Sequence, residues 1–574
     1  MTDTVRLTAA QAMARWLSVQ RTETGERFIE GVWAIFGHGN VVGLGEALHD
    51  IGEDLPTWRG QNEQTMAHAA IAFAKASARR RAMAVTSSIG PGATNMVTAA
   101  ALAHANRLPV LLIPGDVFAN RAPDPVLQQI EDFDDGTVSA NDCFRPVSRY
   151  FDRIVRPEQL MTALPRALQT MTDPAKCGPV TLAFCQDVQA EAFDYPERFF
   201  EPTVWRIRRP EPDRDELAAV AAALEAAERP VIVAGGGVIY SGAEEALLDF
   251  ARRRNVPVTE TQAGKGALGW EEPLNLGPVG VTGGDAANAA LAEADLVLGV
   301  GTRFQDFTTG SWTVFANPER TLVSVNVAGY DAAKHGALPL VADAKRALEA
   351  LEAALGDRTW PDHQDAGRRT RWYEAADAVT AAPQAEGLPT DAQVIGAVQR
   401  RARPDTVVMC AAGTMPGALH TLWRPPAGGY HMEYGYSCMG YEIAGAIGIK
   451  LARPDADVVC FVGDGSYMMA NSELATAVMQ RVPFTVVLTD NRGYGCINRL
   501  QRSCGGAEFN NLYASANVEA QPEIDFVAHA ASMGAHAEKA AGIAELESRL
   551  DAARGREVPT VIVIDTDPDR KSVV

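Results

Sequence analysis

Two strand ends in the last third of the chain carry side chains that suit a metal ion and a phosphate group. Asp464 follows the apolar run 458–462 within Gly-Asp-Gly-Ser, and Asn491 follows the apolar run 485–489. The stretch 472–480 predicts a helix that connects these two runs, so both polar residues would reach the same edge of a parallel sheet, where open α/β sheets bind ligands. Carboxylate and amide oxygens suit Mg²⁺ whose remaining positions are filled by a phosphate.

The glycines beside this aspartate support the same interpretation. Gly463 and Gly465 let the backbone approach a phosphate closely, and a helix N-terminus helps to offset its charge. A chain with a net charge of −20 would repel a diphosphate without a cation. Taken alone, Gly-Asp-Gly is more often a simple strand-to-helix turn, and the second strand end is what favours a ligand site.

We expect the elements that position these residues to be buried parallel strands covered by helices. The strand candidates are short, almost continuously apolar and followed by Gly, Pro, Asp or Asn, as is typical of sheets buried on both faces. Ala-rich stretches at 216–227 and 344–355 have helical spacing. The nine strand candidates are 32–36, 82–86, 110–114, 180–184, 231–234, 296–300, 458–462, 485–489 and 560–564.

Two stretches have no sustained helical or strand periodicity of apolar residues, and we expect them to be linkers: 192–215 and 357–389. They divide the chain into three α/β domains, 1–191, 216–356 and 390–574, each with a doubly wound parallel sheet. The first and third domains share a plan, since each has a Gly-rich turn after an early strand.

Composition narrows the class of protein. The 574 residues are 47% hydrophobic and 22% charged, as in a folded enzyme. The net charge of −20 argues against general binding to nucleic acid or anionic membranes. No apolar run approaches the roughly 18 residues of a membrane span, and no signal-peptide core precedes the first domain. Eight cysteines without a Cys-x-x-Cys pair predict reduced thiols and a cytoplasmic location.

The motif pair resembles that of the thiamine-diphosphate enzymes, in which Gly-Asp-Gly is followed one strand later by Asn-Asn. Asp490 stands at the first asparagine position, and Asn491 keeps the second. The resemblance implies thiamine diphosphate and Mg²⁺ as cofactors. It further implies that the metal ligands are Asp464, Asn491 and the backbone carbonyl of Gly493, with Gly463, Gly465 and Ser466 against the diphosphate. The three domains would then bind the pyrimidine, serve as a central domain, and bind the diphosphate.

The first domain carries a second family motif. The segment from Gln61 to Ala70 is similar to the family's His-Glu-Gln-x-Ala-Ala-His, which implies that Glu63 activates the cofactor by proton exchange with its pyrimidine. In the family this glutamate serves a cofactor bound to the third domain of the partner subunit, so a homodimer is the minimum and a homotetramer is expected. The alternative is a solvated glutamate stabilised by a helix N-terminus.

Three further segments follow from the resemblance. The stretch 433–441 is similar to the family segment that bends the cofactor, with Met439 as the wedge and Ser437 beside it; the alternative is a core methionine. Gly413 and Thr414 are expected to line the cofactor. The Gly-Gly-Gly run at 235–237 is a weak dinucleotide motif, and the unit lacks an acidic residue ending a second strand where a ribose would need one, so we expect no nucleotide in the central domain.

Local departures favour one branch of the family. The layout resembles the acetohydroxyacid-synthase branch, but Gly-His-Gly-Asn at 37–40 replaces the Tyr-Pro-Gly turn of the synthases. With 124–129, 141–150 and 171–176, this turn resembles inositol-catabolic members that hydrolyse a C–C bond of a small polyhydroxylated cyclic 1,2-diketone. The candidates for guiding water and protons are His38 and Asn40.

The remaining candidates are His68, for positioning substrate or pyrimidine, and Gln128 and Gln129, for substrate contacts. A neutral histidine suits proton transfer near pH 7, although a lone histidine in a turn is often structural. The alternatives are an acetolactate-synthase-like carboligase of 2-oxoacids and a non-catalytic binder of the cofactor. The segment 567–574 could cover the site or be disordered, and the sequence leaves both open.

Overall fold

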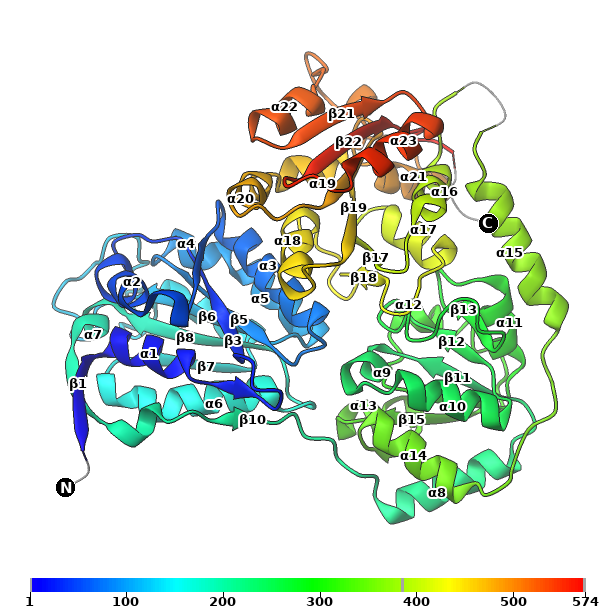
Figure 1. Cartoon of the computed structure of the whole chain (residues 1–574), viewed down its shortest axis with the longest axis horizontal. Helices are drawn as coiled ribbons and strands as arrows, with labels where there is room; N and C mark the ends of the chain where they lie inside the picture. The colour runs from blue at the N-terminus through cyan, green and yellow to red at the C-terminus, as the bar shows by residue number, and fades with distance from the viewer. Residues whose placement is uncertain (1–2, 384–386, 571–574) are drawn as a thin grey trace. The chain divides into compact units, whose positions relative to one another are not determined.

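The computed structural model describes residues 3–383 and 387–570, and these residues form three six-stranded parallel sheets (Figure 1). The first and third sheets have the same strand order when their strands are counted along the chain, which confirms their shared plan. In each sheet the first strand along the chain lies in the interior, and the later strands are added first on one side of it and then on the other. Because crossovers between parallel strands are right-handed, this change of side places helices on both faces. The three doubly wound α/β domains are therefore confirmed.

The chain divides into two compact units. The first, here the pyrimidine unit, comprises Met1–Arg208, Gly435–Pro454 and Ala470–Val482. The second, here the diphosphate unit, comprises Arg209–Tyr434, Asp455–Met469 and Pro483–Val574, of which 571–574 lie outside the described residues. The expectation for the tail 567–574 therefore falls partly outside the described chain.

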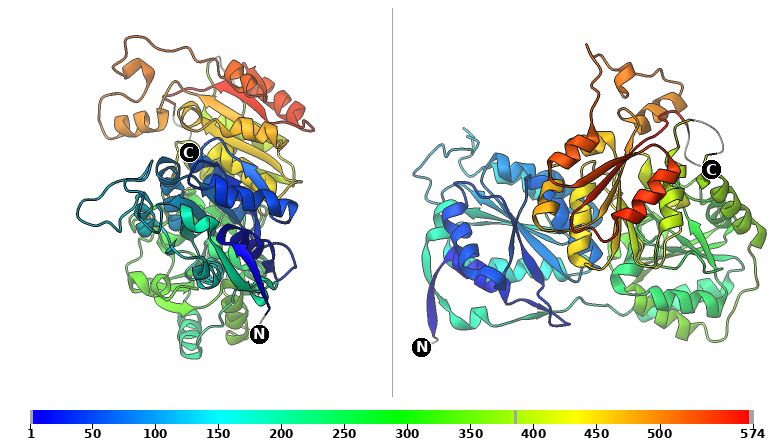
Figure 2. Two further views of the ribbon diagram at one scale, coloured as in Figure 1. Left: turned by 90° about the vertical axis from the view of Figure 1, so that its left-hand side faces the viewer. Right: turned by 45° about the horizontal axis from the view of Figure 1, so that its top comes forward.

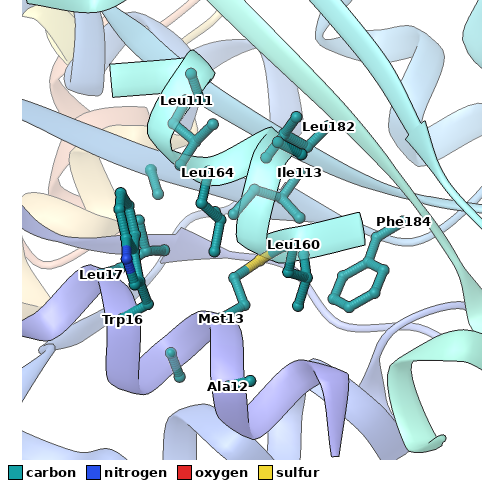
Figure 3. Close-up of a cluster of buried hydrophobic side chains, with 14 of the residues drawn as sticks. Ala12, Met13, Trp16, Leu17, Leu111, Ile113, Leu160, Leu164, Leu182 and Phe184 are labelled. Carbon is teal, nitrogen blue, oxygen red and sulfur yellow. The ribbon is translucent and has the colours of Figure 1, made fainter. Parts of the chain in front are cut away.

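The sheet of the pyrimidine unit has the order β4-β3-β5-β6-β8-β7. Its core joins α1 and α6 to strands β6 and β8 through Met13, Trp16, Leu160 and neighbouring apolar side chains (Figure 3). The strands are β3 (Ile29–Ala34), β4 (Thr57–Arg59), β5 (Ala82–Ser87), β6 (Val110–Asp116), β7 (Tyr150–Ile154) and β8 (Pro179–Cys185). The helices are α1 (Ala9–Ser18), α2 (Glu46–Ile51), α3 (Glu63–Ala76), α4 (Pro91–Asn95), α5 (Val97–Asn106), α6 (Leu160–Thr172), α7 (Gln186–Ala190), α18 (Glu442–Ala452) and α20 (Glu473–Met479).

Helices α3 and α18 pack closely because both are built from small residues. Every residue of α3 from Thr65 to Ala74 is buried. A Cβ added at Gly448 of α18 would lie only 2.1 Å from the carbonyl oxygen of Ala69, so the contact requires glycine there. This packing fixes the helix whose first residue is Glu63.

The first predicted linker is partly folded in the structure. Within 192–208, β9 (Ala192–Pro196) pairs antiparallel with β1 (Thr4–Thr8), and β10 (Val204–Trp205) pairs with β2 (Arg21–Thr22). These pairings hold that segment on the pyrimidine unit. By contrast, the segment after β6 forms a long exposed loop that extends outward from this sheet (Figure 2).

The central sheet lies in the diphosphate unit, in the order β13-β12-β11-β14-β15-β16. The glycine run after β11 is used for packing, since a Cβ at Gly235 would lie 2.4 Å from the carbonyl oxygen of Gly301. The strands are β11 (Pro230–Ala234), β12 (Val258–Glu260), β13 (Asn275–Pro278), β14 (Leu296–Val300), β15 (Thr321–Asn326) and β16 (Leu338–Val341). The helices are α8 (Arg214–Ala226), α9 (Gly236–Ser241), α10 (Glu244–Arg254), α11 (Asp285–Glu293), α12 (Asp306–Thr309), α13 (Gly329–Ala333) and α14 (Ala344–Ala354).

One feature of this sheet corrects the sequence analysis. The second strand, β12, does end in an acidic residue, Glu260, although none was recognised from the sequence. Its side chain is buried and accepts hydrogen bonds from the backbone N–H groups of Gly266 (3.2 Å) and Leu268 (3.1 Å). The carboxylate therefore organises the following loop.

The third sheet has the order β18-β17-β19-β20-β22-β21. The second predicted linker contains a helix of its own, α15 (Ala366–Thr380), which contacts α16 and α11. The strands are β17 (Thr406–Cys410), β18 (Tyr430–Met432), β19 (Asp457–Gly463), β20 (Thr485–Asp490), β21 (His536–Ala540) and β22 (Thr560–Asp565). The remaining helices are α16 (Asp391–Arg401), α17 (Met415–Leu422), α19 (Asp464–Met469), α21 (Gly495–Ser503), α22 (Phe526–Ser532) and α23 (Ile543–Ala553).

Candidate active site

The structure brings the three predicted metal ligands together at the carboxyl ends of β19 and β20, which pair in parallel. The carboxylate of Asp464 accepts hydrogen bonds from the backbone N–H groups of Gly493 (2.8 Å) and Asn491 (3.4 Å). The carbonyl oxygen of Gly493 faces the same turn, because a Cβ added at Gly465 would lie 3.5 Å from it. The Asn491 side chain accepts from the N–H of Gly495 at 3.2 Å. A carboxylate, an amide and a carbonyl therefore lie in one turn.

The electrostatics of this turn favour a cation. Asp464 is fully buried, and burial together with the neighbouring charge of Asp490 raises its pKa to about 7, against the lowering effect of its backbone donors. A divalent ion would supply the missing positive charge. Among the described residues no group of three or more His, Cys, Asp or Glu side chains is arranged to hold a metal, so an ion here depends on the mixed oxygen ligands.

Open space beside the glycines fits a bulky phosphorylated group. A Cβ added at Gly463 or at Gly413 would meet no atom within 4 Å. Gly493 has φ +139°, and a Cβ there would lie 2.5 Å from the carbonyl oxygen of Asn511, so this turn requires glycine. Ser466, the third residue of α19, is buried beside this turn. The residues present therefore fit Mg²⁺ with a diphosphate.

The loop that holds Gly413 is fixed by an arginine that the sequence analysis did not select. The guanidinium of Arg499, on α21, donates to the hydroxyl of Thr414. It also donates to the carbonyl oxygen of Pro568 at 2.7 Å, near the end of the described chain. Arg499 therefore connects the predicted cofactor loop with the helix that follows residues 491–493, the turn predicted to bind the metal and here called the metal turn.

Glu63 begins α3 in the pyrimidine unit, whereas Asp464 belongs to the diphosphate unit. The side-chain amide of Asn95, on α4, donates a hydrogen bond to the Glu63 carboxylate at 3.0 Å. A Cβ added at Gly92 would lie 3.1 Å from the same carboxylate, so α4 approaches it closely. Glu63 is half-buried, which leaves part of its carboxylate accessible.

The segment that contains Ser437 and Met439 lies against the start of α3. The side-chain amide of Gln64 contacts the sulfur of Cys438 at 3.9 Å. Ser437 is exposed with φ +56°, and Met439 is half-buried. The pyrimidine unit therefore places this segment beside Glu63.

The turn after β3 presents His38 and buries Asn40. His38 is exposed, whereas only 1% of Asn40 is accessible. The Asn40 side chain accepts from the N–H of Gly37 (2.9 Å) and donates to the hydroxyl of Thr86 on β5 (3.1 Å). A π-helical turn, Val41–Gly45, follows, a geometry frequent at functional sites. The amide of Asn40 is thus engaged in shaping the turn that carries His38.

His68 lies in the core between α3 and the residues before α18. It is fully buried, with its ring 5.4 Å from that of Tyr441. Burial lowers its pKa to about 4, a shift that the backbone of Gly440 only partly opposes. His68 is therefore neutral near pH 7 and is separated from solvent.

The two glutamines lie in the long loop after β6. Gln128 is exposed with φ +66°, and its carbonyl oxygen would lie 1.6 Å from a Cβ added at Gly90, so the loop rests on the turn before α4. The side chain of Gln129 accepts from the N–H of Ala140 at 3.1 Å and so anchors the loop. Gln128 is thus exposed, whereas Gln129 is half-buried and its side-chain carbonyl oxygen is engaged within the loop.

The sequence analysis missed two residues that contact the Glu63 segment. Asn95 follows a Gly-Pro-Gly turn after a buried strand, a signal that could have selected it. Glu473 is buried and reaches the residues around Glu63. No local pattern identifies it, because a glutamate on a helix is usually solvated.

Two general properties agree with the sequence analysis. No disulfide joins the eight cysteines of the described chain. Among residues 3–383 and 387–570, no helix has the length and apolar character needed to cross a bilayer.

Comparison with known families matches all three domains in order. Residues 30–135 match the N-terminal TPP binding domain of thiamine pyrophosphate enzymes, 217–351 match their central domain, and 411–564 match their C-terminal TPP binding domain. Glu63 lies within the first match, and the metal turn lies within the third.

Curated relatives extend this similarity over the whole chain. The chain is 44% identical to the 3D-(3,5/4)-trihydroxycyclohexane-1,2-dione hydrolase of Geobacillus thermodenitrificans, over 99% of its own length and 93% of the relative. It is 45% identical to a protein of the same name, hydrolase 2, from Bacillus cereus, over 99% and 94%. The similarly named protein of Halalkalibacterium halodurans is 44% identical over 99% and 93%.

Proposed function

Since the chain belongs to the thiamine pyrophosphate enzymes, we propose that it hydrolyses a C–C bond of 3D-(3,5/4)-trihydroxycyclohexane-1,2-dione in myo-inositol degradation. The product would be the ring-opened 5-deoxy-D-glucuronate. The observation that carries the proposal is the identity of 44–45% over 99% of the chain to hydrolases named for this substrate. The matched region covers 99% of the chain and so includes all three domains.

The overall reaction needs no oxidant. The hydroxyl of water adds to one carbonyl carbon of the dione and a proton adds to the other, so breaking the bond between them gives a carboxylic acid and an aldehyde. Bound thiamine diphosphate supplies a nucleophilic carbon and then stabilises the negative charge left by the broken bond. The protein must bind the cofactor, move protons and admit one water molecule.

Glu63 is proposed to exchange a proton between its carboxylate and the aminopyrimidine. The Asn95 amide orients this carboxylate, and its half-buried position leaves an oxygen accessible. Proton-transfer groups of this kind contribute about 10²–10⁴-fold to turnover. A protein that only bound the cofactor would have no use for such a group, which argues against a non-catalytic role.

Asp464, Asn491 and the carbonyl of Gly493 are proposed to hold Mg²⁺, with the open positions at Gly463 and Gly413 admitting the diphosphate. The support is the buried carboxylate of Asp464, whose pKa is raised by burial and by the neighbouring charge of Asp490. The ion would neutralise that carboxylate and the phosphate charge together.

His38 is proposed to guide water or protons near the substrate. It is exposed on a turn fixed by Asn40, and an imidazole side chain can accept or release a proton. Exposed Gln128 can donate and accept hydrogen bonds to the substrate hydroxyls.

We further propose a cytoplasmic homodimer or homotetramer, with Glu63 serving the cofactor held by the partner subunit. The support is the family resemblance. The separation of Glu63 and Asp464 into different compact units is compatible with such sharing.

Product analysis tests the proposal. The enzyme is incubated with Mg²⁺, thiamine diphosphate and the dione, with pyruvate in a parallel reaction, and the products are identified by NMR. We expect a ring-opened aldehyde acid from the dione and unchanged pyruvate. Acetolactate from pyruvate with unchanged dione would instead support the carboligase alternative and overturn the substrate assignment.

A further inference from the structure

Glu473, on α20, is a buried carboxylate outside the predicted site. Only 1% of the residue is accessible, and its Oε1 accepts hydrogen bonds from the N–H groups of Gln61 (2.8 Å) and Asn62 (3.1 Å). The hydroxyl of Thr65 lies 2.7 Å from the same oxygen and can donate either to it or to the carbonyl oxygen of Asn62 at 3.0 Å. Burying a carboxylate is costly unless donors meet its charge, and here backbone donors do so.

These donors lie on both sides of Glu63. Gln61 and Asn62 precede it in the chain, and Thr65 follows it within the first turn of α3. The side chain of Asn62 caps the helix by accepting from the N–H groups of Gln64 (2.9 Å) and Thr65 (3.3 Å). The backbone around Glu63 is therefore fixed by one side chain from its own segment and one from α20.

The carboxylate of Glu63 is fixed separately, by the Asn95 amide at 3.0 Å. Close packing restricts it further, because a Cβ added at Gly92 would lie only 3.1 Å from the carboxylate. Backbone and side chain thus have independent supports, both within the pyrimidine unit.

We propose that Glu473 is a positioning residue for Glu63, which holds the start of α3 while Asn95 holds the carboxylate. The inference rests on the proposed proton exchange by Glu63. Proton transfer requires the two heavy atoms to meet at hydrogen-bond distance, so a small displacement of the helix start lowers the rate. A displacement of 1 Å at a reacting group can cost about 10²-fold.

Two variants of Glu473 separate charge from contact. Glu473→Gln keeps an acceptor oxygen but replaces charge-assisted hydrogen bonds by weaker neutral ones, so we expect turnover to fall about 10-fold. Glu473→Ala removes the acceptor and should cost about 10²-fold. Partial retention of turnover in the glutamine variant would show that the hydrogen-bond acceptor is what matters.

A double-mutant cycle with Glu63→Gln tests whether the effect passes through Glu63. If Glu473 acts only by positioning Glu63, adding Glu473→Gln to Glu63→Gln changes turnover by less than about 2-fold. An equal fold-loss in both backgrounds would overturn the inference. Full turnover of Glu63→Gln alone would instead overturn the proposed role of Glu63, so the two failures are distinguishable.

A second readout needs no bound cofactor. In the cofactor-free protein, Glu473→Gln should speed amide hydrogen exchange at Gln61 and Asn62, and unchanged exchange there would contradict the inference. Glu30→Gln is the matched control, since Glu30 is a partly buried glutamate of the same unit paired with Arg81. It should leave exchange at both amides and the turnover unchanged.

Asn95 keeps the inference testable if the Glu473 variants do not fold. Asn95→Asp is nearly isosteric but replaces the donating amide by a carboxylate that cannot donate when ionised and that repels the Glu63 carboxylate, so we expect turnover to fall by about 10-fold or more. Unchanged turnover would show that the 3.0 Å contact does not orient the carboxylate.

Discussion

Replacing Asn40 by alanine should loosen the turn that carries His38 while leaving the imidazole of His38 itself in place. The substitution deletes two hydrogen bonds of a side chain that is 1% exposed, one with the N–H of Gly37 and one with the hydroxyl of Thr86. Thr86 keeps its own donation to the carbonyl oxygen of Ile113 at 2.8 Å, so only part of its bonding is lost. At about 1 kcal/mol for each hydrogen bond, plus a further cost for buried groups left without partners, the loss is about 2–3 kcal/mol.

Local hydrogen exchange is the suitable assay, because unfolding of a chain with several domains is not two-state. Peptides covering β3 and β5 should exchange faster in Asn40→Ala by the factor that this loss of local stability implies. The control is His38→Gln, which alters an exposed side chain and should change local stability by less than about 0.5 kcal/mol. Turnover should nevertheless fall by about 10²–10⁴-fold in that control if His38 moves a proton.

The combined variant decides how Asn40 acts. If Asn40 serves only to hold His38, adding Asn40→Ala to His38→Gln should lower turnover no further. Wild-type turnover in His38→Gln would refute the role of His38. Unchanged exchange in Asn40→Ala would refute the stability argument made from the two hydrogen bonds.

Three other outcomes are expected. Asp464→Ala should lose Mg²⁺-dependent retention of thiamine diphosphate on dialysis, and normal retention would refute the ligand assignment. Mixing inactive Glu63→Gln and Asp464→Ala subunits should restore activity if each site is shared between subunits, because one site of a mixed dimer is then intact, whereas no rescue would favour sites within one chain. Burial, with the nearby charge of Lys265, lowers the pKa of His420 to about 3 against an ordinary 6.5, so the unfolded chain binds a proton below pH 6.5 that the folded chain refuses. The contribution of His420 to local stability should therefore fall by about 1.4 kcal/mol per pH unit from pH 6.5 toward 3, and His420→Gln should lessen the acid-induced loss of protection in α17 when its hydrogen exchange is compared with that of the wild type at each pH.

The fold was largely predictable from the sequence because strands buried on both faces must be apolar along their whole length. All nine strand candidates overlap strands of the structure, and 296–300 coincides with β14 (Leu296–Val300). The prediction was least complete where an element depends on a distant partner. The segment 192–208 contains strands because β1 and β2 are available for pairing, and the sequence of the segment alone does not predict these strands.

The same distinction applies to the candidate site. Asp464 and Asn491 were recognisable because both follow apolar strands, and the order of β19 and β20 in the sheet makes them neighbours. The contacts around Glu63 were not recognisable from the sequence. Asn95 is 32 residues from Glu63 in the chain, and Glu473 is 412 residues from its hydrogen-bond partner Gln61. Contacts at such separations follow from the packing of α3 against α18 and from the position of α4.

The sequence by itself determined the chemistry available to this protein: a carboxylate and an amide at two strand ends, a glutamate at a helix start, and the apolar runs that place them in three parallel sheets. Only the tertiary structure decided which of these groups are already engaged. It buries His68 completely, engages the amide of Asn40 in a turn and the hydroxyl of Thr414 with Arg499, and turns Glu473 toward the residues around Glu63. The physical reason is that burial and hydrogen bonding depend on which segments meet in space, whereas side-chain type and strand pattern are local properties of the chain.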